Sequence, residues 1–197
     1  MKFQECWCKY CKTYKFPALW HLGNNTYWLE IPKNGSASMK TKYDGRMAFI
    51  KNRTMMNHVT PIIILRDPLT RFYGSFRHYF FEGAERFHRG KTFCKRLGIN
   101  IDTMDVSQRY KFLVQNLDKL STVDEVHHFH PQTKFIDQVN FRRFRPIKIQ
   151  DLSKLLAVSK INHTKHVGPP ISKEFDSYIK SLYKEDYEFF KEHGINL

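Results

Sequence analysis

One short run of apolar residues limits the folds open to this chain more than any other feature. Pro61 is followed by Ile62-Ile63-Ile64-Leu65, and then directly by the charged residues Arg66 and Asp67. A continuous apolar run of strand length, without alternating polar residues, is typical of a strand buried on both faces, as in a parallel sheet. We therefore expect a sheet that is flanked by helices.

A strong helix signal comes directly after this strand. Asp67 can cap a helix whose first position is Pro68, and aromatic residues then recur at helical spacing. This pattern predicts a helix over residues 68–81, with a buried face made of Phe72, Phe76, Tyr79 and Phe80.

Further elements alternate along the chain. We expect strands over 26–31 and 146–149, and helices over 38–49, after Asp105, over 152–158 after Asp151, and over 172–193. This alternation predicts an α/β fold with a mostly parallel sheet. Residues 25–197 are expected to form one domain, preceded by an extension of unknown role over residues 1–24, which is rich in Lys, Cys and aromatic residues.

Charge narrows the range of partners. The 197 residues contain 33 Lys+Arg and 19 Asp+Glu, so the net charge is 33 − 19 = +14, and such a field favours an anionic partner. The 17 Phe and 10 Tyr argue against a disordered chain. Since neither a signal peptide nor an apolar run of membrane-spanning length is visible, we expect a soluble, cytoplasmic protein.

The cysteines leave two interpretations open. Cys6, Cys8 and Cys11 form a C-x-C-x-x-C cluster, and His21 or Cys94 could supply a fourth ligand for zinc. The second ligand pair of a typical structural zinc site is missing, and reduced thiols are the alternative.

Polar segments follow the first two predicted strands. The first is Pro32-Lys33-Asn34-Gly35-Ser36-Ala37-Ser38, and the second begins at Arg66. Ligands of open α/β sheets bind beyond the carboxyl ends of the strands, where helix N-termini, a lysine and an arginine can hold phosphate. A surface turn is the alternative for the first segment. In the second, a salt bridge to Asp67 is the alternative for Arg66 and the preferred interpretation for Arg71.

These two segments, 33 residues apart and in this order, resemble those of a known family. IPKNGSAS is similar to the 5′-phosphosulfate loop, and LRDPLTRFYGSFRHYF to the 3′-phosphate motif, of sulfotransferases that use 3′-phosphoadenosine 5′-phosphosulfate (PAPS). The later stretches HHFHPQTKFID, PIKIQDLSKLL and KEDYEFF resemble carbohydrate sulfotransferases. The resemblance implies their fold, a P-loop-like parallel sheet flanked by helices. It also implies PAPS as the donor substrate, a carbohydrate hydroxyl as the acceptor, and no metal.

The resemblance also implies a role for individual residues. Lys33 would contact the bridging oxygen of the sulfate ester, and Arg66 would hold the 3′-phosphate. Contacts to the phosphosulfate would come from the rest of the first segment: Asn34, Gly35, Ser36, Ala37 and Ser38.

Two positions depart from the family pattern. Ala37 stands where the family has Thr, and Gly74 stands where it has Ser. The neighbouring Ser75 could replace that serine, although one residue along a helix rotates a side chain by about 100°.

A transferase of this kind also needs a base for the acceptor hydroxyl. The resemblance favours His128, which aligns with a family histidine, and then His58, which lies between the two motifs. Glu82 and Glu85 remain possible.

Two basic groups bear on the acceptor. The first group consists of Arg77, His78, Arg86, His88, Arg89 and Lys91, and the second of Arg142, Arg143 and Arg145. These groups indicate either that the acceptor is an acidic glycan or that they form a solvated face.

Other functions remain open. A basic α/β protein that binds nucleic acid would explain the charge, but not the positions of Lys33 and Arg66. A family member that binds the donor without transferring sulfate is a further alternative. The missing G-x-x-x-x-G-K-[ST] pattern disfavours a nucleotide kinase.

Overall fold

Five strands form one mixed sheet in the computed structural model, which describes residues 18–22, 26–43, 48–49, 61–120, 123–137, 140–156 and 172–197. The strand order is β3-β1-β2-β4-β5. The strands are β1 (Ala18–His21), β2 (Tyr27–Glu30), β3 (Ala48–Phe49), β4 (Ile62–Leu65) and β5 (Arg145–Lys148).

The predicted mostly parallel sheet is confirmed. β2 pairs with β4, and β4 with β5, in parallel register, whereas β1 is antiparallel to both of its neighbours. Four of the five described strands therefore run in one direction. The carboxyl ends of β2 and β4 lie side by side, because Leu29 is paired with Ile63.

Strand β1 was not predicted from the sequence, and it lies inside the predicted N-terminal extension. It pairs with β2 from Ala18 against Glu30 to His21 against Tyr27. The sheet therefore begins before residue 25. Residues 1–17 lie outside the described part of the chain.

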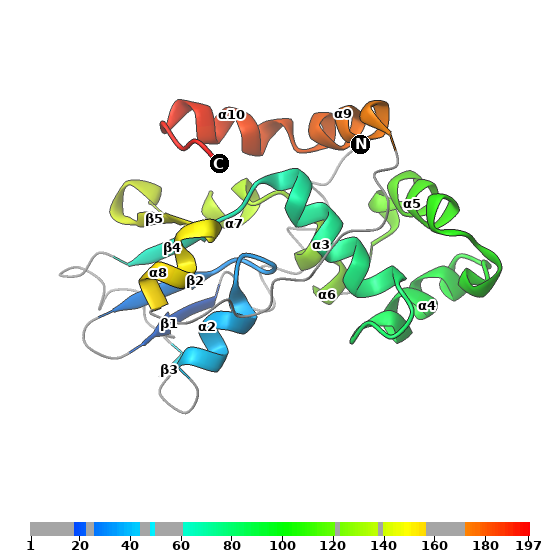
Figure 1. Cartoon of the computed structure of the whole chain (residues 1–197), viewed down its shortest axis with the longest axis horizontal. Helices are drawn as coiled ribbons and strands as arrows, with labels where there is room; N and C mark the ends of the chain where they lie inside the picture. Colours follow the sequence, from blue (N-terminus) through cyan, green and yellow to red (C-terminus); the bar gives the residue numbers. More distant parts are fainter. Residues whose placement is uncertain are drawn as a thin grey trace.

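Helices occupy most of the remaining described chain (Figure 1). They are α2 (Ser36–Lys42), α3 (Pro68–Phe80), α4 (Phe87–Arg96), α5 (Val106–Gln115), α6 (Val123–Phe129), α7 (Thr133–Ile136), α8 (Leu152–Leu156), α9 (Lys173–Leu182) and α10 (Lys184–Glu192). Short 3₁₀ turns are η2 (Ile101–Thr103), η3 (Leu117–Lys119), η4 (Phe141–Arg143) and η5 (Ile149–Asp151). None of these helices combines the length and the apolar character needed to cross a bilayer.

Two predicted helix starts are confirmed by their caps. The Asp67 carboxylate accepts a hydrogen bond from the backbone N–H of Thr70 at 2.8 Å and begins α3. Asp105 begins α5 with a complete capping box, in which its side chain and that of Gln108 exchange hydrogen bonds with the backbone.

Two other predicted helices differ from the structure. The helix expected over 38–49 is the shorter α2, because residues 48–49 pair with β1 as strand β3. The helix expected over 172–193 is divided at Tyr183 into α9 and α10. Tyr183 is fully buried there and its hydroxyl donates to the carbonyl of Phe129, so packing determines the break.

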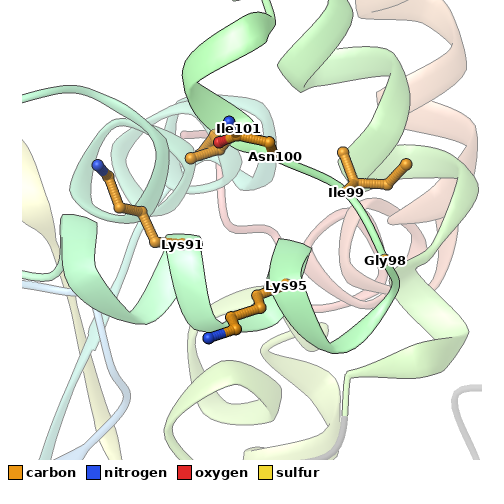
Figure 2. A pocket seen from close by; sticks show the side chains of 6 residues that line it. All are labelled: Lys91, Lys95, Gly98, Ile99, Asn100 and Ile101. Carbon is orange, nitrogen blue, oxygen red and sulfur yellow. The ribbon is translucent and has the colours of Figure 1, made fainter.

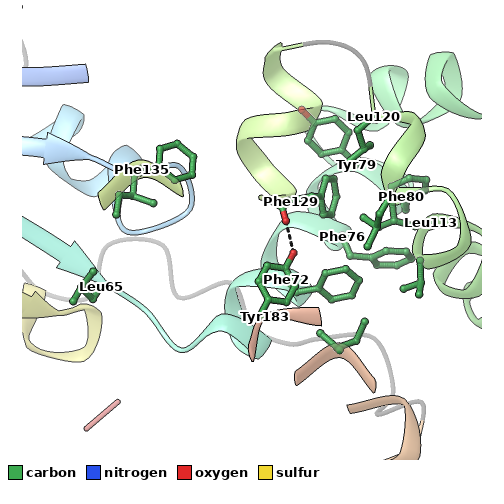
Figure 3. Close-up of a cluster of buried hydrophobic side chains, with 14 of the residues drawn as sticks. Leu65, Phe72, Phe76, Tyr79, Phe80, Leu113, Leu120, Phe129, Phe135 and Tyr183 are labelled. Atoms are coloured by element: carbon green, nitrogen blue, oxygen red, sulfur yellow. Dashed lines mark hydrogen bonds between the residues drawn. The ribbon is translucent and has the colours of Figure 1, made fainter. Parts of the chain in front are cut away.

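Alternate residues of β4 enter different hydrophobic clusters, so both faces of the strand are buried as predicted. Ile63 and Leu65 belong to the larger cluster, which contains the aromatic face of α3. Ile62 and Ile64 belong to the smaller cluster, which contains Leu152 of α8. In Figure 3 the rings of α3 gather with Tyr183, away from Leu65.

Candidate functional site

The loop after β2 has an unusual backbone. Lys33 has a φ of 67° and Gly35 has a φ of 82°, so both lie in the left-handed region that favours glycine. A Cβ on Gly35 would lie 2.5 Å from Cδ2 of Leu152. The positive φ therefore favours glycine at position 35, and a larger residue would also displace the side chain of Leu152.

Most side chains of this loop already have partners within the protein. Asn34 is buried, and its Nδ2 donates to the carbonyl of Ile64 at 2.8 Å. The Ser36 hydroxyl donates to the carbonyl of Ile31 at 3.2 Å, and Ser38 is buried. Ala37 belongs to α2, and its side chain lies outside the described part. Among the described side chains of this loop, Lys33 is the one that can offer a positive charge to a ligand.

The structure brings the two predicted segments together. Nη1 of Arg66, which follows β4, donates to the backbone carbonyl of Lys33 at 3.2 Å. Its Nε donates to the hydroxyl of Thr70 at 3.3 Å. No carboxylate of the described residues forms an ion pair with Arg66. The alternative of an Arg66–Asp67 salt bridge is wrong, because the Asp67 carboxylate caps α3 and accepts from the Tyr187 hydroxyl.

Positive charge is concentrated at Lys33. No carboxylate of the described residues contacts its ammonium group. Burial, followed by the charges of Arg86 and Arg66, lowers the pKa of Lys33 from 10.5 to about 7. Burial and the charge of Arg71 likewise lower the pKa of Arg66. An anion bound between these groups would remove their mutual repulsion, so the electrostatics favour an anionic ligand.

Two histidines, His78 and His128, lie within the electrostatic influence of Lys33 and Arg86, and we call these four residues the charged cluster. His128, the first candidate for the base, is buried, and its Nδ1 lies 3.4 Å from the Tyr79 hydroxyl. Burial and then Lys33 and Arg86 lower the pKa of His128 well below 6.5. The His78 ring lies 5.9 Å from the His128 ring, and burial and then Lys33 lower the pKa of His78 to about 4. The second candidate, His58, lies outside the described residues.

The glutamates considered as bases lie mostly in solvent. The Glu82 side chain is 74% exposed and lies 3.6 Å from Nη2 of Arg109. The Glu85 side chain is 77% exposed, and its Oε2 lies 3.7 Å from Nε2 of His78. Glu85 is therefore close to the charged cluster, and Glu82 is placed beside Arg109.

The predicted replacement of the family serine by Ser75 is not supported by its position. Ser75 is fully buried, and its hydroxyl donates to the carbonyl of His128 at 2.7 Å. Gly74 is the residue that faces Arg66, because a Cβ there would lie 3.3 Å from Nη1. Consecutive residues of a helix point about 100° apart, so Gly74 faces Arg66 whereas Ser75 points into the core.

The predicted salt bridge between Arg71 and Asp67 is wrong. Arg71 is completely buried and does not pair with Asp67. Its Nε donates to the carbonyl of Pro32 at 3.0 Å, and Nη1 and Nη2 donate to the carbonyls of His130 at 2.6 Å and His127 at 3.0 Å. Arg71 therefore ties the loop after β2 to the chain around residue 130.

Gln132 was not singled out by the sequence, although it lies in the HHFHPQTKFID stretch. It is fully buried, and its side-chain amide forms hydrogen bonds with Asn34 and with the backbone of Arg66. Its position next to the recognised histidines was the available signal. Its contacts are with Arg66 and Asn34, which lie 66 and 98 positions earlier in the sequence. The spacing of residues along the sequence does not reveal contacts over such separations.

The basic groups proposed for the acceptor divide into two kinds. His78 and Arg86 are half-buried and act on Lys33 or on His128. His88, Arg89, Lys91 and the second group, Arg142, Arg143 and Arg145, are exposed. Only part of the first group is therefore turned toward the candidate site.

The proposed zinc ligands are not assembled in the described residues. Cys6, Cys8 and Cys11 lie outside them, and Cys94 is a buried free thiol whose pKa burial raises to about 11. Within the described chain no group of three or more His, Cys, Asp or Glu side chains is arranged to hold a metal ion.

A pocket of about 470 Å³ lies elsewhere, at the C-terminal part of α4 (Figure 2). Its lining residues are Lys91, Lys95, Gly98, Ile99, Asn100 and Ile101. Lys91 is paired there with Asp102 at 2.8 Å. None of the residues of the two strand ends contributes to this pocket.

Comparison of the chain with protein families, with curated proteins and with solved structures found no significant match.

Proposed function

We propose that this protein is a PAPS-dependent sulfotransferase that moves a sulfuryl group from PAPS to a hydroxyl group of a carbohydrate acceptor. The observation that carries the proposal is the contact between the two predicted phosphate-binding segments. Arg66 donates a hydrogen bond to the carbonyl of Lys33 at the adjacent carboxyl ends of β2 and β4. A nucleotide that carries phosphates at both its 3′ and 5′ positions could engage both side chains at once.

Electrostatics supports an anionic donor. Lys33 and Arg66 are largely removed from water and lie beside each other without an ion-paired carboxylate from the described residues. Two cations that are buried side by side each destabilise the charged form of the other, and a bound polyanion reverses this effect. The 3′-phosphate would lie at Arg66 and the 5′-phosphosulfate at Lys33.

The transfer step needs few groups. The acceptor oxygen attacks the sulfur in line with the bridging oxygen, a new S–O bond forms, and the old one breaks. The electron pair stays on the 5′-phosphate of adenosine 3′,5′-bisphosphate, where the Lys33 ammonium stabilises the developing charge. The acceptor proton passes to a histidine of the cluster, His128 or His78.

Donor binding would also prepare that histidine. Burial, and then the charges of Lys33 and Arg86, depress the pKa values of both His78 and His128. Negative charge on the donor would offset the part that is due to the two cations, and so raise both pKa values, while the part that is due to burial would remain. Donor binding would therefore make either histidine a stronger base than it is in the free protein.

Calorimetric titration with adenosine 3′,5′-bisphosphate tests the donor site. We expect micromolar binding by the wild-type protein and a loss of about tenfold or more in Arg66→Ala, because one charge-assisted contact is removed. Arg142→Ala removes the same charge from an exposed position and serves as the matched control. Absence of binding by folded wild-type protein contradicts the proposal.

A transfer assay with labelled PAPS and a panel of glycans separates the remaining alternatives. Binding without transfer would identify a donor-binding protein. If the bisphosphate does not bind but DNA or RNA does, with steep salt dependence, the protein is a nucleic-acid-binding protein.

A further inference from the structure

Gln132 lies between the two anion-binding segments and contacts both. Its Nε2 donates to the carbonyl of Arg66 at 2.7 Å, and its Oε1 accepts from the backbone N–H of Arg66 at 3.2 Å. The same Oε1 accepts from Nδ2 of Asn34 in the first segment. A single side-chain amide thus joins the residue after Lys33 to the backbone of Arg66.

The orientation of this amide is fixed by its partners. A backbone carbonyl only accepts hydrogen bonds and a backbone N–H only donates them, so the nitrogen and oxygen of Gln132 have one arrangement at Arg66. Asn34 is oriented in the same way, because its Nδ2 also donates to the carbonyl of Ile64. The link between the segments therefore has one defined geometry.

The backbone of Gln132 is itself held in place. The Asp186 carboxylate on α10 accepts from the N–H of Gln132 at 2.9 Å and from the N–H of Thr133 at 2.8 Å. Nη1 of Arg71 holds the carbonyl of His130, two residues earlier. The side chain of Gln132 thus extends from a fixed point into the space between the segments.

We propose that Gln132 is the positioning residue that sets the distance between Lys33 and Arg66, so that both ends of a doubly phosphorylated nucleotide bind together. The inference rests on the proposed function. Once one phosphate is bound, the second binds intramolecularly, and the gain in affinity depends on how well the two sites are placed. Gln132 touches no ligand in this role and acts through the two segments.

The test compares adenosine 3′,5′-bisphosphate with adenosine 5′-monophosphate by calorimetry. We expect wild-type protein to bind the bisphosphate at least about tenfold more tightly, through the added contact at Arg66. Gln132→Met has similar length and lacks all three hydrogen bonds. It should reduce this preference to within about threefold and leave the affinity for the monophosphate nearly unchanged, since each half of the site persists.

Gln132→Asn is the conservative variant, which also answers the question if Gln132→Met does not fold. It keeps an amide donor and acceptor without adding a charge, but it is one methylene group shorter and cannot reach both segments. Its preference should lie between those of wild type and Gln132→Met. Tyr183→Phe removes the hydrogen bond of another fully buried side chain, which lies outside both segments, and should lower the Tm while keeping the full preference.

Each outcome has a separate meaning. A wild-type protein that binds neither nucleotide overturns the proposed function, and this inference with it. If the wild type shows the preference and folded Gln132 variants keep it in full, only the positioning role is overturned. An equal loss of affinity for both nucleotides also overturns that role, because it indicates general damage to the fold.

Discussion

At the candidate site Arg66 is held by the backbone carbonyl of Lys33 and the hydroxyl of Thr70, and neither Lys33 nor Arg66 forms an ion pair with a carboxylate of the described residues. Arg66 donates to the carbonyl of Lys33, and Lys33 adopts a left-handed backbone conformation that lysine rarely takes. The left-handed backbone of Lys33 and the burial of two neighbouring cations both raise the energy of the empty site. A ligand that supplies negative charge recovers part of that energy, so the residues are prepared for an anion before it binds.

The lowered pKa of Lys33 gives ligand binding a defined pH dependence. In the free protein this pKa is about 7, and a bound polyanion raises it. Above pH 7 the free lysine has lost its proton and the bound lysine keeps one, so binding takes up a proton. We expect the affinity for adenosine 3′,5′-bisphosphate to fall by up to about tenfold per pH unit above pH 7, measured calorimetrically.

Two variants isolate the contribution of Lys33 to this profile. Lys33→Met lacks the titrating group and should bind more weakly at pH 6, with a flatter profile above pH 7. Lys33→Arg keeps its charge throughout the range and should also be flatter. A slope in Lys33→Met as steep as that of the wild type would assign the pH dependence to another group.

At the scale of single residues, the sequence predicted Lys33 and Arg66 but not the residues that hold them in place. The spacing of Lys33 and Arg66 after two strands was sufficient to predict that they meet at one sheet edge. Arg71 and Gln132 bind backbone carbonyls and amides of distant segments. Every residue has such groups, so no residue type in the sequence marks the partner.

At the scale of elements, α3 carries the site on one face and the core on another. Thr70 and Gly74 face Arg66, whereas Phe72 and Phe76 enter the larger hydrophobic cluster. The sequence predicted this helix well, because its cap and its apolar period are local signals. It missed β1 and the break between α9 and α10, which depend on pairing with β2 and on the burial of Tyr183.

The contact between α3 and α4 depends on a glycine. A Cβ on Gly90 would lie 1.9 Å from the backbone carbonyl oxygen of Tyr79, which a helix cannot move without shifting as a whole. We expect Gly90→Ala to lower the free energy of unfolding by about 1–3 kcal/mol, measured by urea denaturation. Lys95→Ala, on the exposed face of the same helix, should change it by less than about 0.5 kcal/mol. Equal stability of the two variants would contradict the close approach.

At the scale of the molecule, the candidate site combines four regions that are distant in the sequence. The loop after β2, the start of α3, the residues before α7 and Asp186 of α10 share one hydrogen-bond network. In Figure 1, α9 and α10 run along the top of the view, and α3 lies below α9, to the right of the strands. The alternation of elements predicted the class of fold, whereas the strand order depends on β1, whose reversed direction no local pattern indicated.

Removing the carboxylate of Asp186 should affect both stability and binding. Asp186→Ala leaves the N–H groups of Gln132 and Thr133 without their acceptor, and we expect a loss of about 3 kcal/mol in the free energy of unfolding. The affinity for adenosine 3′,5′-bisphosphate should fall as well, because Gln132 is released. Urea denaturation and calorimetry measure the two effects.

The control is another acidic residue of the same helix. Glu188 is exposed and forms an ion pair with Lys184 at 3.3 Å, so Glu188→Ala should change neither quantity appreciably. If Asp186→Ala binds the nucleotide as tightly as Glu188→Ala does, α10 does not support the site.

The anchoring of Gln132 by Asp186 has a consequence for the order of events during synthesis. A ribosome makes the Lys33 loop, Arg66 and Gln132 well before α10, and domains generally fold as units. Until α10 has emerged and docked, the amide groups of Gln132 and Thr133 lack their carboxylate, and the nascent chain does not hold its phosphate-binding parts in register. If the proposed function is correct, a growing polypeptide of this sequence would gain its affinity for nucleotide late, after α10 has left the ribosome.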